Sequence, residues 1–249
     1  MKYRALVTLA VVLACVLALE LACALGWVAR TVIIPPSEMV GSLSDILRSG
    51  EFNGAIVLTL TNVMISVVIS ISAGFVLGVA IHASDFLRRA VEPYLASYYA
   101  VPTFIFYPVF IVLFGVNSAA IIAIAVLLSI VAMITATMNG LDRIPTVLLR
   151  TAKIMHLSPV KTALMIQLPA AAPYFFTGAR LSVAYSFIGV IASEFILSGD
   201  GLGYAIAYAY NNFENRQMYG LMLLIVIAVT LVNMTLDRLD RRLQSRLRR

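Results

Sequence analysis

Residues 119–138 read AAIIAIAVLLSIVAMITATM, a stretch without a single charged side chain. A helix needs roughly 20 apolar residues to cross the ~30 Å hydrocarbon core of a bilayer, so this stretch can span a membrane. The whole chain of 249 residues is 61% hydrophobic and only 12% charged, whereas soluble domains carry about 25% charged residues. The apolar runs do not alternate with polar residues as barrel strands do. The sequence therefore predicts an all-α membrane protein.

Six segments have the length and composition of membrane spans, and together they predict a single transmembrane domain over residues 1–249. We expect the spans at residues 5–29, 55–81, 95–114, 119–138, 174–197 and 218–236. The first segment could instead be a signal peptide, because Lys2 and Arg4 precede it and small residues surround Ala24. Its apolar run is longer than an ordinary signal sequence, which favours a retained span.

Lysine and arginine fall mainly on one side of these spans. With the N-terminus inside, the cytoplasmic segments collect the basic N-terminus, Arg88, Arg89, the 139–172 connection and the basic tail at 237–249, while the other side keeps only Arg30, Arg48 and Arg216. The positive-inside rule then predicts that both termini are cytoplasmic. This topology accounts for the net charge of +6 without nucleic acid. The basic tail could also contact anionic membrane lipid.

The 139–172 connection is the longest expected on the cytoplasmic side, and it is unusually polar. It contains Arg150-Thr151-Ala152-Lys153-Ile154-Met155-His156 and, further on, Ile166-Gln167-Leu168-Pro169. A first short helix is expected to start near Pro145, and a second to run over 159–167, with Ser158 as its N-cap and Leu168-Pro169 as its end. Two short helices joined by a tight bend would form a rigid knob for a soluble partner. The alternative is an amphipathic linker on the membrane surface.

At these residues the chain resembles the inner-membrane permease subunits of ATP-binding-cassette importers. Their signature is Glu-Ala-Ala, three residues, Gly, nine residues, Ile, one residue and Leu-Pro. Here Ala152, Ile166 and Leu168-Pro169 match that signature, whereas Arg150, Thr151 and His156 replace its Glu, first Ala and Gly. The resemblance implies that the residues contacting an ATPase are Arg150, Thr151, Ala152, Lys153, His156, Leu157, Ser158, Ile166, Leu168 and Pro169.

Further motifs resemble the nitrate, sulfonate and taurine branch of these permeases along nearly the whole chain. They are residues 34–40 (IPPSEMV), Glu92-Pro93, Val101-Pro102, residues 113–116 (LFGV), residues 192–194 (ASE) and residues 201–204 (GLGY). The resemblance implies a type I importer fold with about six helices. It also implies two cytoplasmic ATPase subunits that bind ATP and Mg, a second permease copy in a homodimer, an extracytoplasmic solute-binding protein, and a location in the cell inner membrane. It suggests a small solute such as a sulfonate, nitrate or vitamin precursor.

Two replacements in the signature lead to specific expectations. Glycine at the bend permits a positive φ, which histidine adopts less readily. We therefore expect a conventional bend at His156, the alternative being a strained histidine held for partner contact. Arg150 replaces an acid, which predicts an acidic residue in the docking groove of the partner ATPase.

Candidate solute-pathway or gate residues are polar or aromatic side chains within or near the spans. They are Asn62, Tyr99, Phe104, Tyr107 and Glu194. The chain has no G-x-x-x-x-G-K-[ST] run, so it is not expected to be an enzyme or to hydrolyse ATP itself. Its two histidines, His82 and His156, stand apart, which argues against a metal site or a catalytic triad, and no cofactor is expected in this chain.

An ion-coupled secondary transporter remains the main alternative. Such a protein would show paired broken helices and ionisable residues in the membrane, and neither is evident here. A channel would need a filter loop or a ring of pore-lining residues. Gly199–Gly203 is too flexible and too peripheral for that role.

Overall fold

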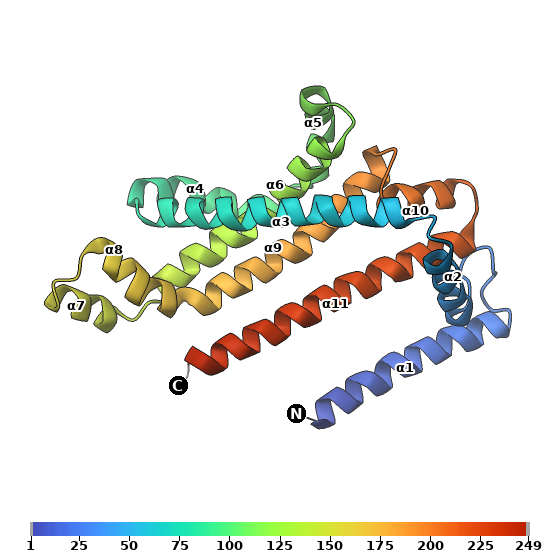
Figure 1. The fold of residues 1–249 in the computed structure, drawn as a ribbon, viewed down its shortest axis with the longest axis horizontal. Helices are drawn as coiled ribbons and strands as arrows, with labels where there is room; N and C mark the ends of the chain where they lie inside the picture. The colour runs from blue at the N-terminus through green and yellow to red at the C-terminus, as the bar shows by residue number, and fades with distance from the viewer. Residues whose placement is uncertain (1, 248–249) are drawn as a thin grey trace. The chain divides into compact units, whose positions relative to one another are not determined.

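The computed structural model describes the backbone of residues 2–247 and the side chains of residues 6–8 and 10–238. Helices and short turns account for all its regular structure, and no strand occurs over residues 2–247. The elements are α1 (Lys2–Ala24), α2 (Pro36–Ser49), α3 (Asn53–His82), α4 (Asp85–Ser97), η1 (Tyr98–Ala100), η2 (Thr103–Phe106), α5 (Tyr107–Phe114), α6 (Ser118–Asp142), α7 (Thr146–Ile154), α8 (Pro159–Thr162), η3 (Ala163–Gln167), α9 (Leu168–Leu197), α10 (Leu202–Asn211) and α11 (Asn215–Leu247) (Figure 1). The predicted all-α class is confirmed.

Among the described residues, five helical segments are long and apolar enough to cross a membrane. They are Leu6–Ala24, Asn53–His82, Ser118–Asp142, Pro159–Leu197 and Asn215–Arg238. A sixth span arises if Asp85–Ala100 and Thr103–Phe114 are counted as one broken span. The chain is therefore a multi-pass membrane protein with five or six spans, as predicted.

The third expected span, 95–114, is not the continuous helix that was predicted. Its two halves meet at a bend of 97°. Val101 (ψ 121°) and Pro102 (ψ 108°) are extended at the break. The cause is local, because the proline ring clashes with a preceding residue in helical conformation and pushes Val101 out of the helix.

The chain packs as two compact units. Unit 1 comprises Met1–Leu58 and Glu194–Ala228, and unit 2 comprises Thr59–Ser193 and Val229–Arg249. The basic tail expected at 237–249 lies outside the described side chains except for Asp237 and Arg238.

In unit 2, helices α3, α6 and α9 lie side by side (Figure 1). Their shared core includes Val67 of α3, Ile121 of α6 and Phe187 of α9. Buried hydroxyls join the same helices: Ser70 Oγ lies 2.5 Å from Ser129 Oγ, and Ser182 donates to the carbonyl of Ser129 at 3.1 Å. In hydrocarbon, such short polar side chains stabilise a helix contact while leaving the backbones close.

Small residues set the distance between these helices. A Cβ atom at Gly78 would stand 2.7 Å from Thr137 Cβ and 3.0 Å from the carbonyl of Ile134. Gly74 meets Met133 in the same way, so the G-x-x-x-G spacing that the two glycines form lies directly on α6. On the adjacent face of α6, Gly178 of α9 comes equally close to Ala136, and Met133 contacts both glycine-bearing helices.

In unit 1, α2 and α10 pack against the start of α11. Ile46, Leu202, Ile206 and Leu221 are buried together. The sequence predicted α2 but treated 198–217 as a turn and a polar loop, so α10 was missed. Glu20, unexplained by the sequence, accepts hydrogen bonds from Ser37 N at 3.0 Å and Ser37 Oγ at 2.6 Å, which caps the first turn of α2.

Replacing Gly78 by alanine tests the contact of α3 with α6. The added methyl group has no room, so Gly78→Ala should destabilise the protein by about 1–3 kcal/mol, as overpacking does. The matched control is Gly54→Ala in the same helix, where nothing lies within 4 Å of the new Cβ. A thermal-unfolding scan in detergent should show a lower Tm for Gly78→Ala only. Equal Tm values would contradict the close contact.

Candidate functional site

A compact projection stands between the spans α6 and α9 of unit 2. We call residues 146–162, from the start of α7 to the end of α8, the basic knob. Pro145 (φ −56°, ψ 126°) stands before α7, and Ser158 caps α8 by accepting from Lys161 N at 3.4 Å, as predicted for that serine. Ala152 is only 2% exposed, so α7 is anchored through this small residue.

The bend of the basic knob is left-handed at His156, where φ is +49°. The expectation of a conventional bend is therefore wrong. His156 N donates to the carbonyl of Lys153 at 3.1 Å, and Leu157 N donates to that of Ala152 at 3.0 Å. These two bonds form a Schellman motif, which satisfies the last carbonyls of α7 and usually holds a glycine where His156 stands.

The second short helix does not end at Leu168-Pro169, contrary to the prediction. It continues without a break into α9, and the helical segment runs from Pro159 to Leu197. A π-turn over Ala163–Gln167 lies immediately before the proline, with Leu168 N bonded to the carbonyl of Ala163. A π-turn widens the helix locally, so the proline that lacks an N–H is accommodated inside it.

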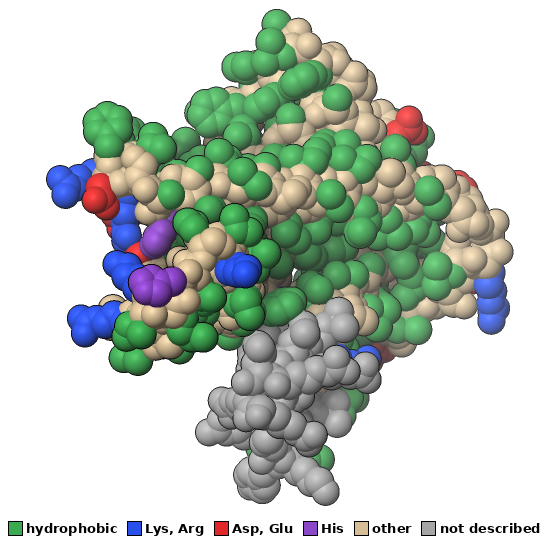
Figure 2. All heavy atoms as spheres, turned by 60° about the vertical axis from the view of Figure 1, so that its left-hand side comes forward, with side chains coloured by type: hydrophobic (Ala, Val, Ile, Leu, Met, Phe, Trp, Pro, Cys, Tyr) green, Lys and Arg blue, Asp and Glu red, His purple; other side chains and the backbone are tan. Residues whose placement is uncertain are grey.

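The surface of the basic knob combines apolar and basic side chains. Val147 is 68% exposed, Ile154 77% and Met155 64%. Arg150, Lys153, His156 and Lys161 are also exposed, and residues 143–167 contain no Asp or Glu. Figure 2 shows Lys, Arg and His side chains gathered with apolar ones at one end of the molecule. Exposed apolar groups ringed by charge are typical of a protein interaction site.

A groove of about 370 Å³ follows the facing surfaces of α6 and α9, also within unit 2. We call it the tyrosine groove. It is lined by Tyr99, Ala132, Thr135, Ala136, Asn139, Arg143, Tyr174, Thr177, Leu181 and Tyr185. Counted from Ala132, the other lining residues of α6 follow at three, four and seven positions, and Arg143, just after α6, follows at eleven. Counted from Tyr174, those of α9 follow at three, seven and eleven positions. Each set therefore occupies one helix face.

The two ends of the tyrosine groove differ in chemistry. At one end the rings of Tyr99 and Tyr185 stack, with centroids 5.1 Å apart and planes 25° apart. At the other end the Arg143 guanidinium lies 5.6 Å from the centre of the Tyr174 ring, a cation–π contact. Arg143 is the one charged side chain in this lining. The groove can therefore hold a small polar molecule and favours a negative charge at one end.

Of the predicted solute-pathway residues, the structure brings only Tyr99 into the tyrosine groove. Asn62 is buried, while Phe104 and Tyr107 lie around the broken span, Phe104 half-buried and Tyr107 exposed. The sequence reading missed Tyr174, Tyr185 and Arg143. Their signal was the helical spacing of polar residues within the fourth and fifth spans, which becomes informative once the two faces are known to meet.

Glu194 lies in unit 1 and is 0% exposed. Its Oε2 accepts a hydrogen bond from Gly203 N at 3.1 Å, in the first turn of α10. Gly201 has a φ of +100°, and a Cβ there would lie 2.5 Å from the Glu194 carboxyl carbon. A carboxylate at a helix N-terminus is favourable for both the orphan N–H groups and the helix dipole. This contact gives Glu194 a positioning role for α10.

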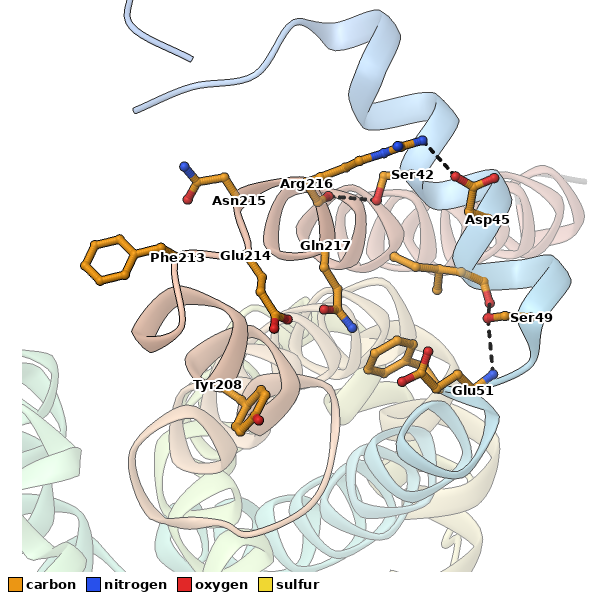
Figure 3. A pocket seen from close by; sticks show the side chains of 12 residues that line it. Ser42, Asp45, Ser49, Glu51, Tyr208, Phe213, Glu214, Asn215, Arg216 and Gln217 are labelled. Carbon is orange, nitrogen blue, oxygen red and sulfur yellow. Dashed lines mark hydrogen bonds and ion pairs between the residues drawn. The ribbon is translucent and has the colours of Figure 1, made fainter. Parts of the chain in front are cut away.

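Unit 1 also carries an open pocket of about 830 Å³, which we call the acidic pocket. It is lined by Ser42, Asp45, Ile46, Ser49, Glu51, Phe52, Tyr208, Phe213, Glu214, Asn215, Arg216 and Gln217. Arg216 pairs with Asp45 at 2.8 Å. The carboxylates of Glu51 and Glu214 have no ion-pair partner within the described side chains. In Figure 3, Glu214 and Gln217 point into the cavity, whereas Phe213 points away.

Comparison with known families accounts for this architecture. Residues 66–249 match the family described as binding-protein-dependent transport system inner membrane component. The chain belongs to this family. The matched region contains the basic knob and the whole tyrosine groove, so both are features of a transport permease domain.

Several curated permeases are similar in sequence. The nitrate import permease protein NrtB of Leptolyngbya laminosa is 29% identical over 181 residues, covering 73% of this chain and 63% of that protein. The putative aliphatic sulfonates transport permease protein SsuC of Bacillus subtilis is 23% identical over 219 residues, covering 88% and 79% of the two chains. These relatives agree with the nitrate and sulfonate branch inferred from the sequence motifs.

A solved structure shows the same fold. A chain of the MetNI methionine ABC transporter, in an inward facing conformation, superposes with a TM-score of 0.66 at 22% identity. The match covers 76% of this permease and 94% of that chain. The expected type I importer fold is confirmed.

Replacing Glu194 by alanine tests its contact with α10. Because Gly203 N would lose a buried acceptor, Glu194→Ala should lower the stability by about 1–3 kcal/mol. Glu194→Gln keeps one acceptor oxygen and should cost less. Gly201→Ala displaces the same carboxylate. In a double-mutant cycle, the variant with both Glu194→Ala and Gly201→Ala should therefore lose less Tm than the sum of the two single losses. Full additivity would separate Glu194 from the α10 turn.

Proposed function

We propose that this permease is the membrane subunit of an ATP-driven importer and passes a small solute along the tyrosine groove. The observation that supports it most directly is the basic knob, an ordered projection with an exposed apolar and basic surface, inserted between two spans of a permease-family chain. A Schellman motif, a Ser cap and a helix continuous with α9 hold the knob in a fixed shape. Such rigidity is needed to transmit movement.

The basic knob would dock on a cytoplasmic ATPase subunit. Two such subunits, one under each copy of the permease in a homodimer, would bind ATP and Mg, and hydrolysis would take place in them. Because α8 is continuous with α9 through the π-turn, a displacement of the knob would be carried into a wall of the tyrosine groove. Rigid-body movement of this kind is one of the known ways in which proteins switch between two states.

The solute would be small and anionic or strongly polar. The volume of the tyrosine groove falls within the range of small-molecule sites, and Arg143 gives it a single positive charge. The named solutes of two relatives, nitrate and aliphatic sulfonates, are anions.

The opposite, extracytoplasmic side would receive a solute-binding protein. This assignment follows from the basic residues: Arg150, Lys153 and Lys161 lie on the knob, and the positive-inside rule places them in the cytoplasm with both termini. The acidic pocket would then face outward. Its Glu51 and Glu214 would complement a basic surface on the binding protein.

Purification of the tagged chain from its host in mild detergent tests the proposal as a whole. A stoichiometric nucleotide-binding subunit with ATPase activity should co-purify with the permease. Replacement of residues 156–158 by three glycines should release that subunit while the permease stays folded. A stable permease that never carries an ATPase would overturn the importer assignment and favour ion-coupled transport.

A charge reversal at Arg150 tests the chemistry of docking. Residues 143–167 carry basic side chains and no Asp or Glu, so a complementary partner surface would be acidic. Such a surface would repel the glutamate of Arg150→Glu, and ATPase binding should weaken at least about tenfold, or ~1.4 kcal/mol. Arg89→Glu, on exposed α4, is the matched control for net charge. Binding is measured by titrating the purified ATPase onto the permease in nanodiscs. Undiminished binding by Arg150→Glu would contradict an acidic docking groove.

Variants of the tyrosine groove test the solute pathway. Tyr185→Ala removes the stacked ring and Arg143→Gln removes the positive charge, so uptake should fall about tenfold or more for each, equivalent to ~1.4 kcal/mol. Tyr94→Ala, with a ring that is 76% exposed on α4, is the control and should transport normally. Uptake of labelled nitrate and of ethanesulfonate is measured in proteoliposomes with the complete importer. Normal uptake by both groove variants would exclude the groove from the pathway.

A further inference from the structure

A third cavity lies within unit 2, between the ends of three spans and the basic knob. Its volume is about 400 Å³. We call it the knob cavity. It is lined by Phe75, Val79, His82, Ala83, Leu141, Ile144, Leu149, Ala163, Gln167, Leu168 and Phe175. It shares no lining residue with the tyrosine groove.

The lining of the knob cavity is almost entirely hydrocarbon. Only His82 and Gln167 are polar among these residues. The rings of Phe75 and Phe175 meet edge to face, with centroids 5.1 Å apart and planes at 90°, and form one wall. A cavity of this size with apolar walls and a few polar groups has the usual character of a ligand site. The ligand would be a slender apolar chain with a polar end.

The position of the knob cavity identifies the source of such a chain. His82 is the last residue of one candidate span, and Leu141 stands next to the last residue of another. The cavity therefore lies at the boundary between hydrocarbon and headgroups. His82 Nε2 is 3.2 Å from Asp142 Oδ1, and Arg88 holds the same carboxylate through two bonds of 2.7 Å. Exposed Arg89 and Lys161 add positive charge on this side, which attracts anionic lipid.

From these observations we propose that the knob cavity binds one acyl chain of a membrane phospholipid, with the headgroup beside His82, where Asp142 and Arg88 lie. The assignment of the inner leaflet rests on the proposed orientation of the permease. The bound chain would lie against Leu149 of α7 and Ala163 of the π-turn. It would therefore pack the basic knob onto the bundle and link the lipid to the movement that couples ATP hydrolysis to transport.

Photo-cross-linking tests the proposal on the complete importer. The complex is placed in nanodiscs that contain phosphatidylglycerol with a diazirine on its acyl chain, illuminated, and mapped by peptide mass spectrometry. Adducts are expected at Leu149 or Ala163 in addition to Met64 and Val68. The last two are each 60% exposed on α3 and report ordinary contact with lipid. Adducts confined to Met64 and Val68 would overturn the proposal.

A variant in which a larger side chain fills the knob cavity provides a second test. Ala163→Phe should reduce the adducts at Leu149 to background while those at Val68 persist. Leu164→Phe is the matched control, because Leu164 is 58% exposed, lies outside the lining and should leave the pattern unchanged. Val79→Phe fills the same space from the opposite wall if Ala163→Phe does not fold. Persistence of Leu149 adducts in a folded, filled variant would also overturn the proposal.

ATPase activity and uptake are recorded on the same nanodisc and proteoliposome preparations. If adducts map to the knob cavity while no ATPase binds, the lipid site stands and the importer assignment fails. If ATPase binding and uptake are normal but the cavity gives no adduct, the importer assignment stands and the lipid site fails.

Discussion

Backbone groups inside a bilayer must find hydrogen-bond partners within the protein, because hydrocarbon offers none. Two prolines of this permease show two ways in which that requirement is met. At Pro102 the helix is interrupted, and the chain restarts as a 3-10 turn before α5. At Pro169 the helix is retained because a π-turn supplies a bond from Leu168 N to the carbonyl of Ala163. Outside the spans, a Schellman motif at the end of α7 satisfies the carbonyls of Ala152 and Lys153 in the same way.

The close approach of α3, α6 and α9 follows from a second property of the bilayer. Lipid tails are as apolar as leucine, so hydrophobicity alone does not hold helices together there. Gly78 of α3 and Gly178 of α9 let two helices approach adjacent faces of α6, and serine hydroxyls bond across the contacts. Beside the contact of α6 with α9, the small side chains of Ala132, Thr135 and Ala136 line the tyrosine groove and leave space for it.

Much of this fold could be predicted from the sequence, because the thickness of the apolar bilayer core sets both the length and the composition of a span. The G-x-x-x-G contact and the Ser158 cap also depend on a few neighbouring residues. His156 and Pro169 were misjudged for the opposite reason. Residue preference disfavours a left-handed histidine and a helical residue before proline, but two hydrogen bonds at His156 and a widened turn at Pro169 outweigh these preferences.

The tyrosine groove was harder to foresee. Arg143 and Tyr174 are 31 positions apart in sequence, and their contact depends on which faces of α6 and α9 meet. Sequence spacing places residues on a helix face but does not pair the faces. Only Tyr99 was named in advance, because it belongs to the aromatic cluster of the third predicted span, which stands out without knowledge of the pairing.

The second helix of the basic knob, one wall of the tyrosine groove and one wall of the knob cavity belong to one continuous helical segment, Pro159–Leu197. A straight helix would transmit any displacement of the knob along its whole length. The π-turn breaks that regularity at Ala163–Gln167, where Ala163 and Gln167 line the knob cavity and Leu168 follows. In the importer that we propose, this turn is where movement of the knob would be passed to the groove or absorbed, and the packing of the knob cavity beside it would decide between the two.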